Sequence, residues 1–128
     1  MRRLTLLATL LCLLVCCGCS RKSTDELLND LDSPVEKDRI VAVRLLPDRK
    51  GDAARVVPAL TEALKSKESD IRWSAAIGLG RFGSDAKEAI PALQKAEQDR
   101  DARVREAARV ALTRIDPEQF PPQSRKKP

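Results

Sequence analysis

A repeat of 33 residues is the feature of this sequence that most constrains its fold. Shifting the chain by that length aligns VPALTEALKSKESDIRWSAAIGLGRF, which begins at Val57, with IPALQKAEQDRDARVREAARVALTRI, which begins at Ile90. The same offset joins Arg39 to Arg72 and Arg72 to Arg105. Self-similarity at such a period predicts a solenoid, in which each repeat buries a face against the next repeat.

Each repeat is predicted to contain two helices. Leu, Ala, Arg, Glu and Lys dominate the chain and aromatic residues make up only 2% of it, which favours helix over strand. First helices are expected near residues 24–32, 52–66 and 85–98, and second helices near residues 34–47, 69–82 and 101–115. The expected fold class is therefore all-α.

Helix ends are indicated by capping residues. Boxes in which an Ser or Asp precedes a Glu by three positions are expected to start three helices: Ser23 with Glu26, Ser33 with Glu36, and Asp85 with Glu88. Gly51 and Gly83 are expected to stop helices, because glycine tolerates the backbone conformations that end them.

The second helices carry a recurring motif. Ile71-Arg72 is followed by Ala75-Ala76 and Leu79-Gly80, and the stretches VVPAL and AIPAL each lie in a first helix. These residues resemble the V-R-x-x-A-A-x-A-L-G and I-P-x-L motifs of HEAT repeats, specifically the short bacterial type associated with phycobilisome lyases. The resemblance covers residues 24–115 and implies a short right-handed α-solenoid of three two-helix repeats that acts as a scaffold.

The stretch GLGRFG, residues 78–83, matches the spacing of a dinucleotide-binding loop. That loop follows a strand and opens a helix, so that the phosphate meets free N–H groups. Here the stretch follows DIRWSAAI, a predicted helical segment, and therefore ends a helix. A nucleotide site is not expected.

Few residues are available for catalysis or metal binding. The chain has no His and no Tyr, and its four cysteines lie within the first 19 residues. The usual catalytic triads and zinc sites cannot be built beyond that point. Carboxylate-only sites stay open, but four acidic residues fall at expected helix starts, where they cap N–H groups: Asp70, Asp85, Asp99 and Asp101. A non-enzymatic chain without cofactor, metal or small-molecule substrate is expected.

Three arginines share one position of the repeat: Arg39, Arg72 and Arg105. They are expected to stack along neighbouring second helices as a structural ladder. The resemblance to HEAT repeats implies that such an arginine pairs with an aspartate in the adjoining turn, for which Asp70 and Asp101 are the candidates. The alternative is an anion-binding stripe, since a bidentate arginine serves either purpose.

A helical wheel of the second helix predicts an outward patch. With the core side set by Ile71, Ala75 and Leu79, Trp73 and Ile77 point away from it. The candidate partner-binding residues are these two and their repeat equivalents: Trp73, Ile77, Ile40, Val110 and Arg44. The resemblance implies that they line a concave surface. The alternative is that Ile77 and Val110 pack between repeats with Trp73 folded over them.

The first twenty residues, MRRLTLLATLLCLLVCCGCS, have the order of a secretory signal peptide: two arginines, an apolar run and small residues. Gly18 followed by Cys19 resembles the lipobox of bacterial lipoproteins, although Cys16 stands where an aliphatic residue is usual. The resemblance implies a signal peptide at 1–18, a lipidated Cys19 and a linker at 19–23. An ordinary cleaved signal and a soluble exported product is the alternative.

The charge balance argues against a nucleic-acid partner. Residues 24–115 hold 17 Lys or Arg and 17 Asp or Glu, so the predicted repeat domain is neutral, whereas a nucleic-acid binder carries its basic excess on the folded surface. The tail at 116–128 is rich in proline and basic residues and is expected to be disordered. The alternatives are docking of Phe120 on the last repeat, and use of Phe120 with Pro121 and Pro122 as a short linear motif.

Together with these observations, the two resemblances imply a scaffold of the bacterial cell envelope, anchored in a membrane through Cys19 and facing the periplasm or the exterior. The resemblance of Ser20 to outer-membrane sorting signals favours the outer membrane if the source is Gram-negative-like. The expected partner is another protein. Two alternatives are a structural subunit that pairs through the ends of the stack, and a soluble exported accessory to a lyase-like enzyme.

Overall fold

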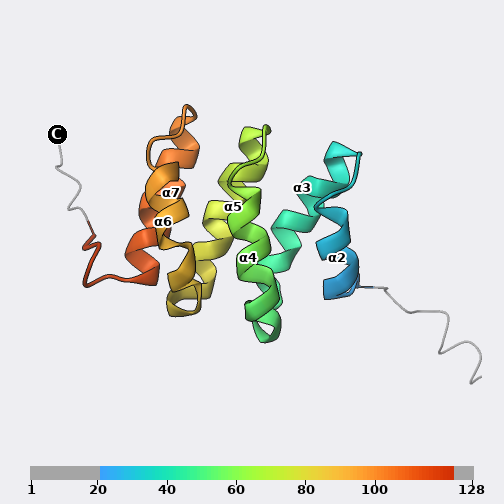
Figure 1. The fold of residues 1–128 in the computed structure, drawn as a ribbon, viewed down its shortest axis with the longest axis horizontal. Helices are drawn as coiled ribbons and strands as arrows, with labels where there is room; N and C mark the ends of the chain where they lie inside the picture. Colours follow the sequence, from blue (N-terminus) through green and yellow to red (C-terminus); the bar gives the residue numbers. More distant parts are fainter. Residues whose placement is uncertain (1–20, 123–128) are drawn as a thin grey trace, which may run out of the picture.

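The computed structural model describes residues 21–122, which are helical and contain no strand (Figure 1). The α-helices are α2 (Thr24–Asp30), α3 (Glu36–Leu45), α4 (Ala53–Ala63), α5 (Ser69–Phe82), α6 (Ile90–Ala96) and α7 (Ala102–Ile115). Three 3₁₀ segments join them: η1 (Leu46–Asp48), η2 (Lys50–Asp52) and η3 (Gly83–Ala89). The all-α prediction is confirmed.

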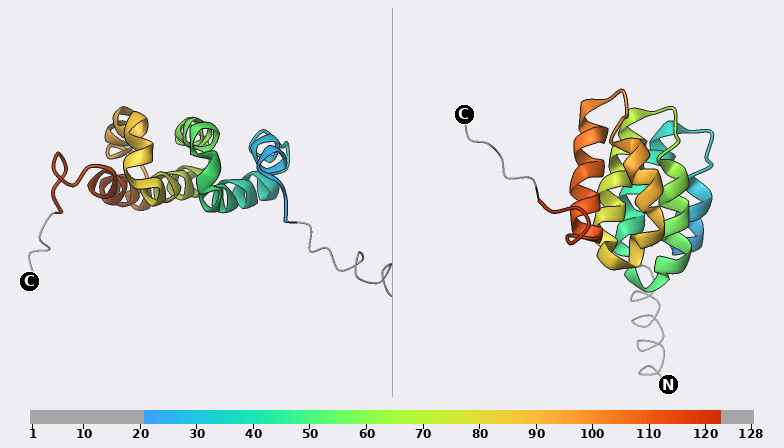
Figure 2. Two further views of the ribbon diagram at one scale, coloured as in Figure 1. Left: turned by 90° about the horizontal axis from the view of Figure 1, so that it is seen from below. Right: turned by 60° about the vertical axis from the view of Figure 1, so that its left-hand side comes forward.

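The helices form two layers, seen edge-on in the left view of Figure 2. The second helices α3, α5 and α7 form one layer, and the first helices α2, α4 and α6 lie on it. Helix α5 packs against both α3 and α7, and each first helix packs against the second helix of its own repeat. Contacts between successive first helices are sparse. The predicted solenoid of three two-helix repeats is therefore present.

The first predicted cap is confirmed and the other two are wrong. Ser23 accepts a hydrogen bond from the backbone N–H of Glu26, whose carboxylate accepts from the N–H of Ser23. Ser33 instead accepts from the N–H of Val35, which fixes a turn, and α3 begins at Glu36 without a side-chain cap. Asp85 lies inside η3 and starts no α-helix.

Gly83 ends α5 as predicted, with φ at 57° and ψ at −133°, a backbone conformation that side chains with a Cβ rarely adopt. Gly51 does not end the preceding second helix, because α3 already stops at Leu45. Pro47 explains the early stop: it has no N–H to donate to the carbonyl of Val43, and the chain continues as the 3₁₀ segment η1.

The helix expected at 85–98 is much shorter than predicted. Its first part is the 3₁₀ segment η3, and only residues 90–96 form α6. The break falls at Ala86, whose backbone lies outside the α-helical region with φ at −101° and ψ at 20°. Pro91 in the first turn suits the new start at Ile90, since the N–H that proline lacks has no partner there.

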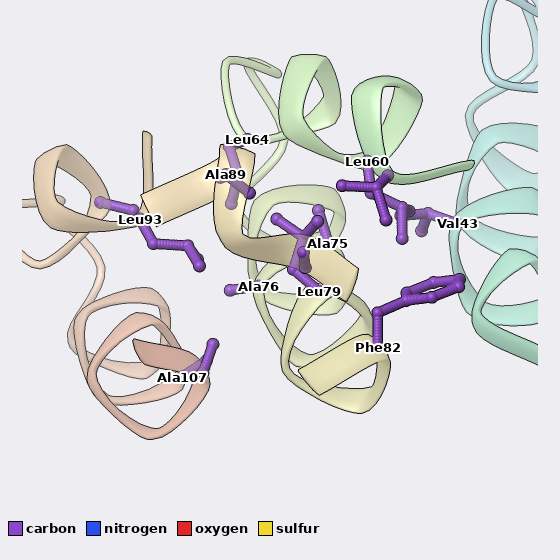
Figure 3. Close-up of a cluster of buried hydrophobic side chains, with 14 of the residues drawn as sticks. Val43, Leu60, Leu64, Ala75, Ala76, Leu79, Phe82, Ala89, Leu93 and Ala107 are labelled. Atoms are coloured by element: carbon purple, nitrogen blue, oxygen red, sulfur yellow. The ribbon is translucent and has the colours of Figure 1, made fainter. Parts of the chain in front are cut away.

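The core runs along the interior between the two layers (Figure 3). Each repeat contributes a fully buried leucine from its first helix at the same position, namely Leu27, Leu60 and Leu93. Burying such a side chain stabilises a fold by about 1.5–3 kcal/mol. Figure 3 shows Leu60 and Leu79 together with Val43, so residues of different repeats share one core.

Small residues let adjacent second helices approach closely. A Cβ added at Gly78 would lie 2.7 Å from Cγ of Pro47 in the preceding repeat. A Cβ at Gly80 would lie 3.0 Å from Cα of Ala111 in the following repeat. Helix α5 therefore presents a glycine toward each of its two neighbouring repeats.

Candidate functional site

Helix α5 carries an apolar ridge on the outer side of the second-helix layer. Ile77 is 36% exposed, although it is a large hydrophobic residue. Trp73, one turn earlier on the same helix, is half-buried and packs partly against the core. Trp73 and Ile77 border two grooves, one toward α7 and one toward α3. We call these the α5–α7 groove and the α3–α5 groove.

The α5–α7 groove has a volume of about 580 Å³. Its apolar lining combines the larger side chains Trp73, Ile77 and Val110 with four small residues: Gly80, Ala102, Ala107 and Ala111. Gly80 permits the close approach of α5 and α7, because a Cβ added there would lie 3.0 Å from Cα of Ala111. Three charged residues also line the groove: Arg103, Glu106 and Arg114.

The α3–α5 groove is smaller, about 380 Å³, and lies on the other side of the same ridge. Val43, Pro47 and Gly78 form its apolar part. Arg44 and Arg81 supply the charges. Four of the five predicted patch residues therefore line a groove: Trp73, Ile77, Val110 and Arg44. Ile40 does not line either groove and packs, half-buried, against the core.

Arg103 lies over the indole ring of Trp73. Its guanidinium carbon lies 5.9 Å from the centre of the ring, within the range of a cation–π contact. The same guanidinium is 3.0 Å from a carboxylate oxygen of Asp70 and 3.1 Å from one of Asp101. Hydrogen bonds from Arg103 lower the pKa of Asp101 to about 2, so this carboxylate stays charged at neutral pH.

Two other arginines of the grooves lack such partners. Within residues 21–122, Arg44 and Arg114 form no ion pair, whereas Arg81 pairs with Asp48 and Arg109 pairs with Glu106. Each of the two grooves therefore contains one arginine whose charge is not matched by a carboxylate of this part of the chain.

The arginine ladder is present, with partners other than those predicted. Nε and Nη2 of Arg72 donate to the two carboxylate oxygens of Asp99 at 2.7 and 2.9 Å. Nη1 of Arg72 donates to the carbonyl oxygens of Ser66 and Lys67, both at 2.9 Å. Both side chains of the ion pair are nearly buried, with 7% of Arg72 and 12% of Asp99 exposed. The hydrogen bonds from Arg72 lower the pKa of Asp99.

The other two arginines repeat this geometry in part. Arg39 pairs with Glu68 and donates to the carbonyl of Ser33 at 2.6 Å. The pKa of Glu68 falls to about 2, through hydrogen bonds from the Ser66 hydroxyl, from its own backbone N–H and from Arg39. Arg105 donates only to backbone carbonyls, among them that of Asp99 at 2.8 Å.

The predicted partners Asp70 and Asp101 are therefore wrong for the ladder. Asp101 caps α7 by accepting from the N–H of Arg103 at 2.8 Å, and both aspartates bind the Arg103 side chain. The carboxylates that serve Arg39 and Arg72 come from the loop of the next repeat. Arg39 and Arg72 therefore each join two repeats, whereas Arg105 has no carboxylate partner in the described part of the chain.

Two other ion pairs between repeats were not predicted, although the sequence contains a signal for them. Asp48 and Arg81 lie one repeat period apart, and so do Asp70 and Arg103. Equivalent positions of adjacent repeats lie side by side in a solenoid, so opposite charges at the same position predict an ion pair between repeats. Both pairs are present in the structure.

No cluster of metal-binding side chains occurs between residues 21 and 122, and no helix in that range has the length and apolarity needed to cross a bilayer. Phe120, for which docking and disorder were both considered, packs against the core, and its N–H donates to the carbonyl of Asp116 at 2.9 Å. The expected disorder of the tail is therefore wrong for its first residues. Residues 123–128 and residues 1–20, which include the predicted signal peptide and Cys19, lie outside the described residues.

Comparison with known proteins gives the family. HEAT repeats match residues 24–118, most of the chain. The chain belongs to the HEAT-repeat family. A solved structure similar to this HEAT-repeat chain is the complex of CpcE and CpcF of phycocyanin lyase from Nostoc sp. PCC7120, with a TM-score of 0.69 and 25% identity. The alignment covers 77% of this chain and 39% of that chain. No curated protein matches the chain.

Proposed function

We propose that this HEAT-repeat chain is a non-enzymatic scaffold that binds another protein through the outer face of its second helices. The observation that carries the proposal is the exposed Ile77 beside the half-buried Trp73, between two grooves. Tryptophan and arginine are both enriched among the residues that dominate binding energy at interfaces. Arg103 lies over this tryptophan at a cation–π distance.

The proposal predicts the effect of charge at the ridge. In the Trp73→Glu and Ile77→Glu variants, we expect recovery of the partner from the native host to fall at least tenfold, because a carboxylate would be desolvated against an apolar surface. The measurement is quantitative co-purification with the tagged chain, alongside circular dichroism to verify that the helices remain. Ile77→Glu is the cleaner variant, since Ile77 is the more exposed of the two.

Leu45→Glu is the control variant, and it tests whether the partner binds at the α3 end of the stack instead. Leu45 is 41% exposed at the repeat position where Gly78 and Ala111 contact the preceding repeat. This exposure favours a second candidate function, a structural subunit that pairs through this end. Loss of the partner with Leu45→Glu and not with Ile77→Glu would replace the first proposal with the second.

At the opposite end of the stack, the position that contacts the following repeat holds a polar residue. Pro47 and Gly80 contact the following repeat, whereas the equivalent residue of the last repeat is Thr113, whose hydroxyl donates to the carbonyl of Arg109 at 3.2 Å. A partner at an end of the stack therefore fits the α3 side. The third function, a soluble accessory to a lyase-like enzyme, is supported by the likeness to the phycocyanin lyase complex. A chromophore bound to the purified chain would favour it.

We further propose that Cys19 carries a lipid that anchors the chain to the bacterial envelope. The support is the sequence alone: a signal-like segment that ends in Gly18 and Cys19. The intact mass of the chain from its native host should begin at Cys19 and include a diacylglyceryl group, and the chain should partition into detergent. An unmodified mass from cleavage elsewhere would instead indicate a soluble exported protein.

A further inference from the structure

We infer that the α5–α7 groove binds an amphipathic helix of the partner that inserts an apolar side chain and places a carboxylate on Arg114. The inference rests on the proposed function and adds the chemistry of the partner. It concerns the groove on one side of the Trp73–Ile77 ridge, in which an apolar lining and an unmatched positive charge occur together.

The apolar part of the groove is shaped for a side chain. Gly80, Ala107 and Ala111 contribute no side chain longer than a methyl group, while Trp73, Ile77 and Val110 also line the groove. A volume of about 580 Å³ is large enough for several aliphatic side chains or one aromatic side chain with its neighbours. The groove is lined by residues of α5 and α7. These two helices lie in one layer (Figure 2), which suits a third helix laid on them.

The unmatched positive charge of the groove favours a partner with a negative charge. Glu106 pairs with Arg109, and Arg103 is matched by Asp70 and Asp101, so neither adds an unmatched charge. Arg114 has no such match within the described residues. Its repeat equivalent Arg81 pairs with Asp48 of the preceding repeat. The residue one repeat before Arg81 is the acidic Asp48, whereas the residue one repeat before Arg114 is Arg81, which is also basic. The position that provides a carboxylate for Arg81 therefore provides none for Arg114.

A carboxylate from the partner would provide the ion-pair acceptor that Arg114 lacks within the described residues. A guanidinium can bind a carboxylate through two parallel hydrogen bonds, and such a pair gains strength when an apolar segment excludes water beside it. A basic helix would instead bring a like charge to Arg114, and a neutral apolar helix would cover this charge without a partner. The groove therefore fits an acidic amphipathic helix better than a basic or neutral one.

The test uses Trp73 as its own probe, because it is the sole tryptophan of the chain. Two synthetic helical peptides share one leucine face and differ only in flanking residues, Glu in one and Lys in the other. Each is titrated into the full chain while the tryptophan emission is followed. We expect the acidic peptide to shift the emission and to bind at least tenfold more tightly than the basic one.

A pair of charge-matched variants assigns the preference to the groove. Arg114→Glu should abolish or reverse the preference for the acidic peptide. Lys95→Glu, which changes the net charge equally at an exposed residue of α6 that lines no groove, should leave it intact. Thermal unfolding of both variants verifies that the fold survives.

Three results would overturn the inference: equal binding of the two peptides, a preference that Arg114→Glu leaves unchanged, or no change in Trp73 emission with either peptide. The proposed function fails separately, when Ile77→Glu leaves recovery of the native partner unchanged. If Ile77→Glu loses the native partner while the two peptides bind equally, the proposed binding face stands and the inference of an acidic helix fails.

Discussion

Replacing Arg72 with alanine is expected to lower the free energy of unfolding by about 3 kcal/mol, because removing one partner of a buried ion pair leaves the other charge without compensation. Arg72 and Asp99 are nearly buried, and the same guanidinium satisfies the carbonyls of Ser66 and Lys67. The variant therefore removes the charged partner of the Asp99 carboxylate, which still accepts from the N–H of Asp101, and it removes one donor from each of the two carbonyl oxygens. Urea denaturation followed by circular dichroism measures the change.

The matched control is Arg105→Ala. Arg105 occupies the same position of the next repeat and donates to the equivalent carbonyls, but it lacks a carboxylate partner among the described residues and its side chain is exposed. We expect this variant to lose less than about 1 kcal/mol, as for a solvent-exposed hydrogen bond. Similar losses for Arg72→Ala and Arg105→Ala would show that the ion pair with Asp99 contributes little.

Gly78→Val is expected to destabilise the fold by about 3 kcal/mol, the upper part of the range for overpacking a close contact. Even a Cβ at Gly78 would lie 2.7 Å from Cγ of Pro47 and 3.1 Å from Cδ1 of Leu60. The proline ring is rigid, so α5 must move away from the preceding repeat to admit a branched side chain. Thermal and urea unfolding report the loss.

Gly51→Ala serves as the control for Gly78→Val. A Cβ at Gly51 has no neighbour within 4 Å, and its φ is not positive. We expect its stability to stay within about 0.5 kcal/mol of the unchanged chain, as for surface substitutions generally. A small effect of Gly78→Val would mean that the contact between α5 and the first repeat is loose.

The sequence predicted the layers of the fold because the repeat period and the helical wheel depend on side-chain spacing alone. Trp73 and Ile77 lie on the outer side of α5 as the wheel requires. The partners of Arg39 and Arg72 were missed because they lie in the next repeat's loop, whose path depends on local turns. Whether the patch binds a protein stays a prediction.

The helix ends show the same limit of local signals. The predicted box at Ser33 failed because its hydroxyl accepts from Val35 two residues later, forming a turn that competes with capping. The helix predicted at 85–98 failed because residues 83–89 adopt 3₁₀ geometry, although their composition suits an α-helix. In the first segment a side-chain turn replaced a helix cap, and in the second a 3₁₀ pattern of hydrogen bonds replaced the α-helical pattern.

The pair of Arg72 and Asp99 also bears on how readily a partner binds. The α5–α7 groove exists only while the last repeat is folded against α5, and this ion pair joins those two repeats. In a linear array the terminal unit opens most easily, since it has one neighbour. Affinity for a ligand of the groove falls in proportion to the fraction of molecules in which the groove is formed. Arg72 does not line the groove, but through this ion pair it raises the fraction of molecules in which the groove is formed.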